Sequence, residues 1–182
     1  MAVVPDTEMA ISGKHLSVYV SYKQPNEFVF YCPYWLVNKS GQPIKVRSKI
    51  THRTFDIPDD TILLFDYKKT NKNNKVMMNV NEGKWSKPFS LEAAGTTGMI
   101  NCKDSRRTYN FLMRITMSNS ARSKLVTFAP FLSIVNQLDE QLSLREWHPH
   151  DKVTANHEWT VVEPISDTSK PAALWTNAGR VT

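Results

Sequence analysis

Residues 28–47 read FVFYCPYWLVNKSGQPIKVR, in which an apolar and aromatic run ends in Val-Asn and a polar turn leads into a short alternating segment. Aromatic and β-branched residues are typical of strands, and the Ser-Gly pair is typical of a turn. The stretch therefore predicts a strand, a turn and a second strand. Shifted by 98 positions, from residue 28 to residue 126, it aligns without a gap to residues 126–145, which read VTFAPFLSIVNQLDEQLSLR.

The two copies share residues at matching positions, and similar segments precede them. An alternating segment and a short polar loop precede each copy, at residues 16–20 and 109–117. Because self-similarity of this kind is the signature of repeat architectures, we predict one complete unit (residues 1–124) plus the truncated start of a second (residues 125–182), within a longer array. Identical pairs are Phe30 and Phe128, Val37 and Val135, Asn38 and Asn136, Arg47 and Arg145; apolar pairs are Leu36 and Ile134, Ile44 and Leu142, Val46 and Leu144.

The rest of the chain also has the pattern of strands. No segment of useful length shows a helical period, whereas short apolar or alternating segments recur between turn residues. Many short strands at this spacing predict an all-β fold of repeated antiparallel β-sandwich modules. The predicted strands cover residues 16–20, 27–37, 44–47, 61–66, 75–80, 98–103, 109–117, 125–135, 142–147 and 158–162.

Composition bounds the class of protein. The 182 residues are 41% apolar and 22% charged, which is ordinary for a globular chain that buries its own core. No run reaches the roughly 20 apolar residues of a membrane span, and the N-terminus has no apolar signal segment. We expect Cys32 and Cys102 to be buried free thiols of a cytosolic protein. The net charge of +6 favours acidic partners such as anionic lipid, nucleic acid or acidic peptide, and selects none of them.

The Val-Asn strand end is the first candidate site. A buried strand that ends before a polar turn needs its last backbone groups satisfied, and an Asn side chain offers one acceptor and two donors for this. Asn38 and Asn136 therefore have two interpretations. Their amides meet an incoming peptide backbone, or they pin the turn of their own module.

A basic loop is the second candidate site. Lys68, Lys69, Lys72 and Lys75 fall within eight residues that are otherwise polar. Each lysine near an anionic membrane contributes about 1 kcal/mol, so the loop is a candidate contact for acidic lipid headgroups. It lacks the interleaved aromatics of a single-strand nucleic-acid binder, and we expect no nucleic-acid partner. The alternative interpretation is a solvated hairpin loop.

The sequence contains no recognisable catalytic or metal site. It has neither Gly-x-Ser-x-Gly nor His-Glu-x-x-His, and the glycines at 95 and 98 lack the Lys-Ser/Thr of a phosphate loop. His148 and His150 form a His-x-His pair near His157, but no further ligand completes a tetrahedral set at familiar spacing. Asp56, Asp59 and Asp60 fit a turn. We expect no enzyme activity, no metal and no cofactor.

Three blocks in order resemble a known family. Residues 31–43 (YCPYWLVNKSGQP), residues 85–98, and residues 125–131 with the following Val135-Asn136 are similar to the adaptor-binding region of the vacuolar protein sorting-associated protein thirteen family of bridge-like lipid transfer proteins. The resemblance covers roughly residues 15–147. The second copy departs from the pattern, because Asp139 stands in place of the turn Gly and Gln141 in place of the Pro.

The resemblance implies a role. In that family the region is an array of β-sandwich modules, each with one invariant Asn near a strand end, and Asn38 and Asn136 match those positions. Such arrays recruit a cytoplasmic lipid-transfer rod to organelle contact sites by binding adaptor proteins through Pro-x-Pro motifs, in a groove associated with late modules. The implied partners are adaptors, neighbouring modules and, indirectly, the organelle membrane. A membrane-surface module and an inert β scaffold are the alternatives.

Overall fold

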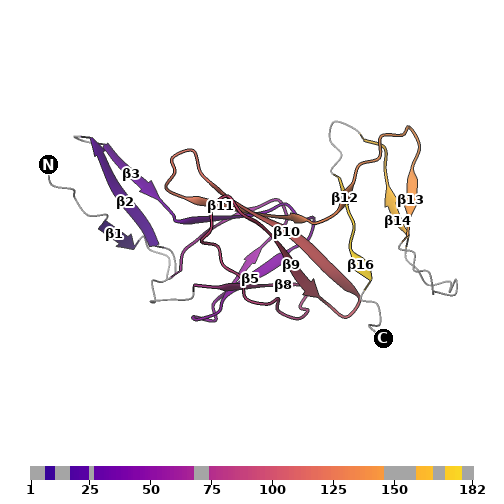
Figure 1. The fold of residues 1–182 in the computed structure, drawn as a ribbon, viewed down its shortest axis with the longest axis horizontal. Coiled ribbons are helices and arrows are strands. Elements are labelled where there is room, and N and C mark those ends of the chain that lie inside the picture. Colours follow the sequence, from indigo (N-terminus) through magenta and orange to yellow (C-terminus); the bar gives the residue numbers. More distant parts are fainter. Residues whose placement is uncertain are drawn as a thin grey trace.

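The computed structural model describes residues 7–10, 17–24, 27–67, 74–145, 159–165 and 171–177. Within these residues every regular element is a β-strand, as predicted, and none of them forms a helix that could cross a membrane. The strands make a central sandwich, with one three-stranded sheet at its N-terminal end and two two-stranded sheets at its C-terminal end (Figure 1).

The larger sheet of the sandwich has six strands. Its order brings together the two ends of the central module, by which we mean the chain from β4 (Tyr34–Asn38) to β11 (Lys124–Pro130). The first strand of the module, β4, lies parallel to the last strand, β11, and Leu36 is paired with Val126. The other pairs in this sheet are antiparallel. Its strands are β9 (Thr97–Lys103), β10 (Arg107–Met117), β11 (Lys124–Pro130), β4 (Tyr34–Asn38), β7 (Ile62–Phe65) and β16 (Thr176–Asn177).

The second sheet is three-stranded, with β5 (Ile44–Ser48) between β6 (Thr54–Ile57) and β8 (Val76–Val80). Its inner face packs on the larger sheet. Alternate residues of each strand point into the core because successive side chains of a strand alternate between its faces. The buried core is shared between the two sheets; it includes Leu36, Phe65, Phe111, Ile115, Val126 and Phe128 on one side and Ile44, Val46, Ile57, Val76, Met78 and Val80 on the other.

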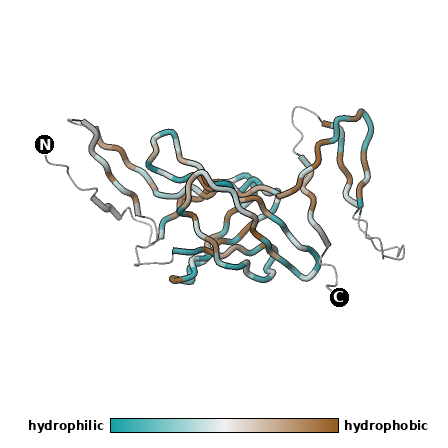
Figure 2. Tube along the Cα trace, viewed as in Figure 1, coloured by the Kyte–Doolittle hydropathy of each residue, from teal (hydrophilic) through white to brown (hydrophobic). Residues whose placement is uncertain are grey.

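Smaller sheets stand at both ends of the sandwich (Figure 1). The N-terminal sheet has the order β1 (Thr7–Ala10), β2 (Ser17–Gln24), β3 (Glu27–Tyr31). Hydrophobic stretches run along both end regions (Figure 2). The C-terminal region has two pairs, β12 (Ser133–Ile134) with β15 (Ala172–Ala173) and β13 (Leu142–Leu144) with β14 (Thr160–Val162).

Two long predicted strands are wrong in extent. The segment predicted over residues 27–37 breaks at Cys32-Pro33 into β3 and β4, which lie in different sheets. The segment predicted over residues 125–135 likewise ends at Pro130 and resumes as β12. Proline has no N–H to donate to a sheet, so the chain leaves one sheet at each of these points and enters another.

Four of the described strands were not predicted: β1, β6, β15 and β16. Strand β6 lies just before the Pro58-Asp59-Asp60 turn and pairs with β5, Ile44 opposite Ile57. Its four residues, TFDI, carry too short an alternation to stand out from the surrounding polar sequence.

Candidate functional site

Asn38 ends strand β4 and has no exposed surface (0%). Its Nδ2 donates to the carbonyl oxygens of Gln42 at 2.7 Å, Ile57 at 2.9 Å and Pro58 at 3.1 Å. Its Oδ1 accepts from the backbone N–H of Ser40 at 3.1 Å and from the Ser40 hydroxyl at 2.6 Å. One side chain thus ties the end of β4 to the following turn and to the end of β6.

Asn136 makes three corresponding contacts 98 residues later. Its Nδ2 donates to the carbonyl of Glu140 at 2.7 Å and to that of Val162 at 3.0 Å, and its Oδ1 accepts from Leu138 N–H at 3.0 Å. It is 2% exposed. The sequence offsets from Asn136 to Glu140 and Leu138 equal those from Asn38 to Gln42 and Ser40, so the repeat extends to individual hydrogen bonds.

This geometry bears on the two interpretations of the Asn residues. Both side chains form hydrogen bonds with the turn that follows them and with a neighbouring strand end. With both amides buried, the pinning interpretation has the stronger support, and it stays a prediction until the substitutions are made.

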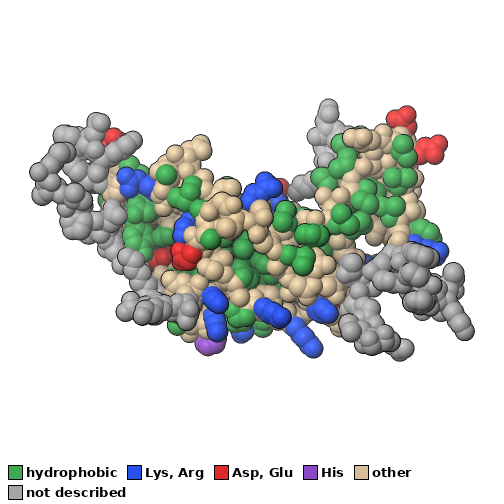
Figure 3. Space-filling model, viewed as in Figure 1, with side chains coloured by type: hydrophobic (Ala, Val, Ile, Leu, Met, Phe, Trp, Pro, Cys, Tyr) green, Lys and Arg blue, Asp and Glu red, His purple; other side chains and the backbone are tan. Residues whose placement is uncertain are grey.

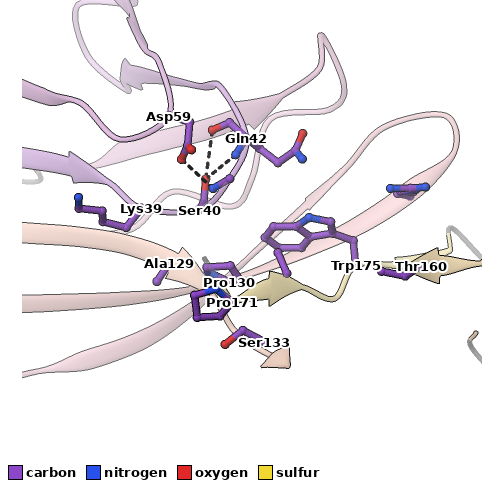
Figure 4. Close-up of a pocket in the computed structure, with 13 residues that line it drawn as sticks. Lys39, Ser40, Gln42, Asp59, Ala129, Pro130, Ser133, Thr160, Pro171 and Trp175 are labelled. Atoms are coloured by element: carbon purple, nitrogen blue, oxygen red, sulfur yellow. Dashed lines mark hydrogen bonds between the residues drawn. The ribbon is translucent and has the colours of Figure 1, made fainter. Parts of the chain in front are cut away.

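A groove of about 520 Å³ lies beside the turn that Asn38 holds (Figure 4). One wall is that turn, Lys39 to Gln42, together with Asp59. The opposite wall is apolar and contributes an aromatic ring, prolines and alanines. It comprises Trp175, Pro130, Pro171, Ala129 and Ala173, and Ser133, Thr160 and Arg107 complete the lining.

Trp175 closes the groove from the far end of the chain. Its ring centroid lies 5.2 Å from that of Tyr109 and 5.1 Å from that of Phe111. Strand β16, which follows it, pairs with the start of β10, Thr176 opposite Thr108. Residues 176–177 therefore join the larger sheet of the sandwich, whereas β15 just before them pairs with β12. Sequence reasoning missed this residue, because the tail shows no strand pattern around it.

Charges of both signs surround the turn. Asp59 Oδ1 accepts a 2.7 Å hydrogen bond from Gly41 N–H, and Lys39 forms an ion pair with Asp60. Asp59 and Asp60 thus support the turn, as expected from the sequence, whereas Asp56 lies in strand β6 and not in the turn. Gly41 has φ +76°, a conformation that glycine adopts without strain.

A second, more aromatic groove of about 320 Å³ lies between the N-terminal sheet and the sandwich. Tyr19 stacks on Tyr31 with ring centroids 5.6 Å apart, and Tyr34 donates to Glu92 at 2.6 Å. Burial acts to raise the pKa of Glu92, but hydrogen bonds from Lys124 and Tyr34 outweigh it and leave that pKa below its usual value. The remaining lining residues are Pro33, Asp66, Tyr67 and Asn74.

The other predicted contacts fall largely outside the described residues. Lys68, Lys69 and Lys72 lie outside the described residues, as do His148, His150 and His157. Lys75 is described; it is partly buried and directly precedes β8. Of the basic residues near this loop, Lys45 is ion-paired with Glu82, and the Arg47 guanidinium lies 4.2 Å from the Trp85 ring centroid. Lipid contact by the basic loop stays a prediction. The described residues contain no cluster of three or more metal-ligating side chains.

Both cysteines are buried and free, as predicted. Burial raises the pKa of Cys32 to about 11 and that of Cys102 to about 12. We expect neither thiol to react with iodoacetamide in the native chain at pH 8, and both to react after unfolding in guanidinium. Rapid labelling of either native thiol, read by mass spectrometry, would contradict this environment.

Comparisons of the sequence with known proteins point to one family. The sequence profile of the vacuolar-sorting associated protein 13 adaptor binding domain matches residues 9–169. The chain is 30% identical over 138 residues to the mouse intermembrane lipid transfer protein VPS13C, 33% over 118 residues to the human one, and 29% over 143 residues to mouse VPS13A. These alignments cover 75%, 64% and 77% of this chain, but only 4%, 3% and 4% of the relatives. The chain belongs to the vacuolar-sorting associated protein 13 adaptor-binding domain family.

Proposed function

We propose that this chain is a non-catalytic interaction module that helps to recruit an intermembrane lipid transfer protein to organelle contact sites. In this proposal the module acts in the cytoplasm, peripheral to the membrane, and binds adaptor proteins through short Pro-x-Pro motifs. Membership of the adaptor-binding domain family supports the general role. The groove beside Asn38 supports the mode of recognition.

The observation that carries the proposal is the composition of that groove. Proline-rich peptides adopt an extended, pre-stiffened helix, and they dock in shallow grooves lined by aromatic side chains at low entropic cost. The Trp175 ring and the flanking Pro130 and Pro171 provide such a surface, and the turn opposite them provides polar groups. A volume of about 520 Å³ suits a few residues of ligand.

Asn38 does not line the groove itself, but it holds the turn that does. Its side chain holds the Gln42 carbonyl and the Ser40 N–H, which belong to the turn that lines the groove. Loss of the Asn38 side chain would therefore deform one wall of the groove. We propose this indirect role in preference to contact between the amide and the peptide.

We also propose a change to the module boundary. The prediction from sequence assigned residues 125–182 to the second module, but β11 hydrogen-bonds to both β4 and β10. A first module that runs through Pro130 keeps β11 with β4 and β10, and the second module then begins with β12; β16 joins this sheet from beyond the boundary. The groove lies at the junction of the two, so neighbouring modules would be part of the binding surface.

Calorimetric titration with a Pro-x-Pro peptide and an Ala-x-Ala peptide of equal length tests the proposal. We expect the first peptide to bind and the second to show no heat. The Trp175→Ala variant should weaken binding by about tenfold or more, because an aromatic anchor in a pocket is the usual hot spot. Trp35→Ala is the matched control, since Trp35 lies outside the groove and is partly exposed on the outer face of β4.

Equal binding of both peptides, or equal loss with both tryptophan variants, would contradict recognition in this groove. Co-sedimentation with anionic vesicles forms a separate arm. Binding that needs anionic lipid and falls with salt, without any peptide binding, would favour the membrane-surface alternative.

A further inference from the structure

The groove between the N-terminal sheet and the sandwich is walled by aromatic rings, and we call it the tyrosine groove. Its volume of about 320 Å³ is at the lower end of the range for ligand sites. Tyr19 and Tyr31 line it from strands β2 and β3. Tyr34 and Tyr67 line it from the central module, with ring centroids 5.2 Å apart at 83°. Because the faces of aromatic rings attract positive charge, such walls favour a cation.

The charged side chains of the lining are all acidic. Asp66 and Glu92 line the tyrosine groove, and the described lining contains no Lys or Arg. This is a local reversal of sign in a chain with a net charge of +6. Acidic side chains are visible on the surface where the N-terminal sheet meets the sandwich (Figure 3). The charge of the groove is therefore complementary to a cation and opposite to that of the whole chain.

Two cations of the chain contact the same tyrosine rings from positions outside the lining. Lys124 Nζ lies 5.3 Å from the ring centroid of Tyr34, and the guanidinium carbon of Arg122 lies 5.7 Å from that of Tyr31. Lys124 also donates to Glu92 at 2.7 Å, so its charge is already paired. These rings thus stabilise positive charge within the chain itself, which supports the same interaction with a ligand.

Two buried polar atoms of the tyrosine groove have no hydrogen-bond partner among the described residues. They are the Tyr67 hydroxyl and Asn74 Oδ1. Tyr67 is only 5% exposed, and the Leu91 backbone, which influences its pKa, has no hydrogen-bond geometry toward the hydroxyl. The Asn74 amide acts on Glu92 as a donor, which leaves its oxygen as an acceptor. Because unpaired buried polar groups are destabilising, both atoms favour a ligand that brings N–H donors.

We propose that the tyrosine groove binds an arginine side chain of a partner protein. A guanidinium is planar, stacks on aromatic rings and carries five N–H donors, so it matches both the tyrosine walls and the unpaired acceptors. A quaternary ammonium suits the rings but has no N–H to donate, and a lysine ammonium does not stack. The groove shares no lining residue with the groove beside Asn38, so the proposal does not depend on Pro-x-Pro recognition.

Titration of the full chain, with labelled tyrosine rings followed by nuclear magnetic resonance, tests the proposal. We expect the peptide Gly-Gly-Arg-Gly-Gly to shift the ring signals of the groove in a saturable way. The same peptide with citrulline in place of arginine keeps the shape but not the charge, and should bind at least about tenfold more weakly. Equal binding of the two peptides, or no saturable shift with the arginine peptide, overturns the proposal. Choline that binds as tightly as the arginine peptide would assign the groove to a quaternary ammonium and also overturns it.

The Tyr67→Phe variant separates binding from folding. It keeps the ring and removes a hydroxyl without a partner, so it should weaken the arginine peptide at least about fivefold and leave the melting temperature unchanged. Tyr109→Phe is the matched control, because Tyr109 lies outside the lining and its hydroxyl donates to Asp104 at 2.9 Å. It should lower the melting temperature and leave binding unchanged. A lower melting temperature for Tyr67→Phe with unchanged binding would show that the hydroxyl is structural, and would overturn the proposal.

Neutralisation of one carboxylate tests the charge of the site. Asp66→Asn should weaken the arginine peptide by about tenfold, because it removes one of the two negative charges of the lining. Asp56→Asn is the matched control, since Asp56 is an exposed carboxylate of β6 outside the tyrosine groove. Equal weakening by the two variants would indicate an effect of net charge alone and contradict binding in this groove.

Discussion

Replacement of Asn38 by Ala is expected to lower the free energy of unfolding by about 3–5 kcal/mol, because several buried polar groups lose their partner at once. The carbonyls of Ile57 and Gln42 lose a donor, and the Ser40 N–H and hydroxyl lose an acceptor. The site is fully buried, so water cannot replace these bonds without a rearrangement of the turn. Guanidinium unfolding monitored by tryptophan fluorescence measures the change.

Two further substitutions test whether the loss of stability is specific to the buried Asn38 side chain. Asn101→Ala removes an exposed amide that donates to Asn110 Oδ1 at 2.7 Å, and should change stability by less than about 0.5 kcal/mol. Asn136→Ala should have an intermediate effect, because fewer buried contacts surround Asn136 in the C-terminal region. If Asn38→Ala proves as mild as Asn101→Ala, the pinning interpretation fails.

Gly83→Ala is expected to destabilise the sandwich by about 2–4 kcal/mol, because no space exists for a β-carbon. A Cβ at this position would overlap the Lys103 carbonyl oxygen and lie 2.8 Å from Asp104 Cα. Both obstacles are backbone atoms. They are held in place by the hydrogen bond from Lys84 N–H to the same Lys103 carbonyl, at 2.7 Å. The clash therefore cannot be relieved by rotation of a side chain.

Gly98→Ala is the matched control. A Cβ at Gly98 meets only the flexible end of Met113, at 3.5 Å, which is an ordinary contact. We expect this substitution to change stability by less than about 1 kcal/mol in either direction. Thermal unfolding followed by circular dichroism distinguishes the two variants, and equal melting temperatures for both would contradict the close approach of β8 and β9 at Gly83.

The repeat was recoverable from sequence because both copies need the same local chemistry. A strand end that turns sharply after a buried run requires an amide at one position, so Asn38 and Asn136 recur with their apolar neighbours. The all-β class was recoverable for a similar reason, since alternation along β10 follows directly from the two faces of a strand.

Other features had little or no local signal. Pro33 marks a point where the run can break, but only the structure shows that β3 and β4 then enter different sheets. The burial of Phe128 and the exposure of Phe30 differ although the two residues match in the repeat. That difference depends on whether a second sheet covers the strand. The residues adjacent in sequence do not predict this coverage.

The sequence by itself therefore determined the strand class, the repeat and the two asparagines, because each of these depends on residues close together in the chain. The tertiary structure alone decided that β4 pairs in parallel with β11, that Trp175 packs against the central module and that a groove forms beside the Asn38 turn. Each of these joins segments far apart in the sequence. Such contacts are selected by the burial of apolar surface over the whole fold, which no local pattern encodes.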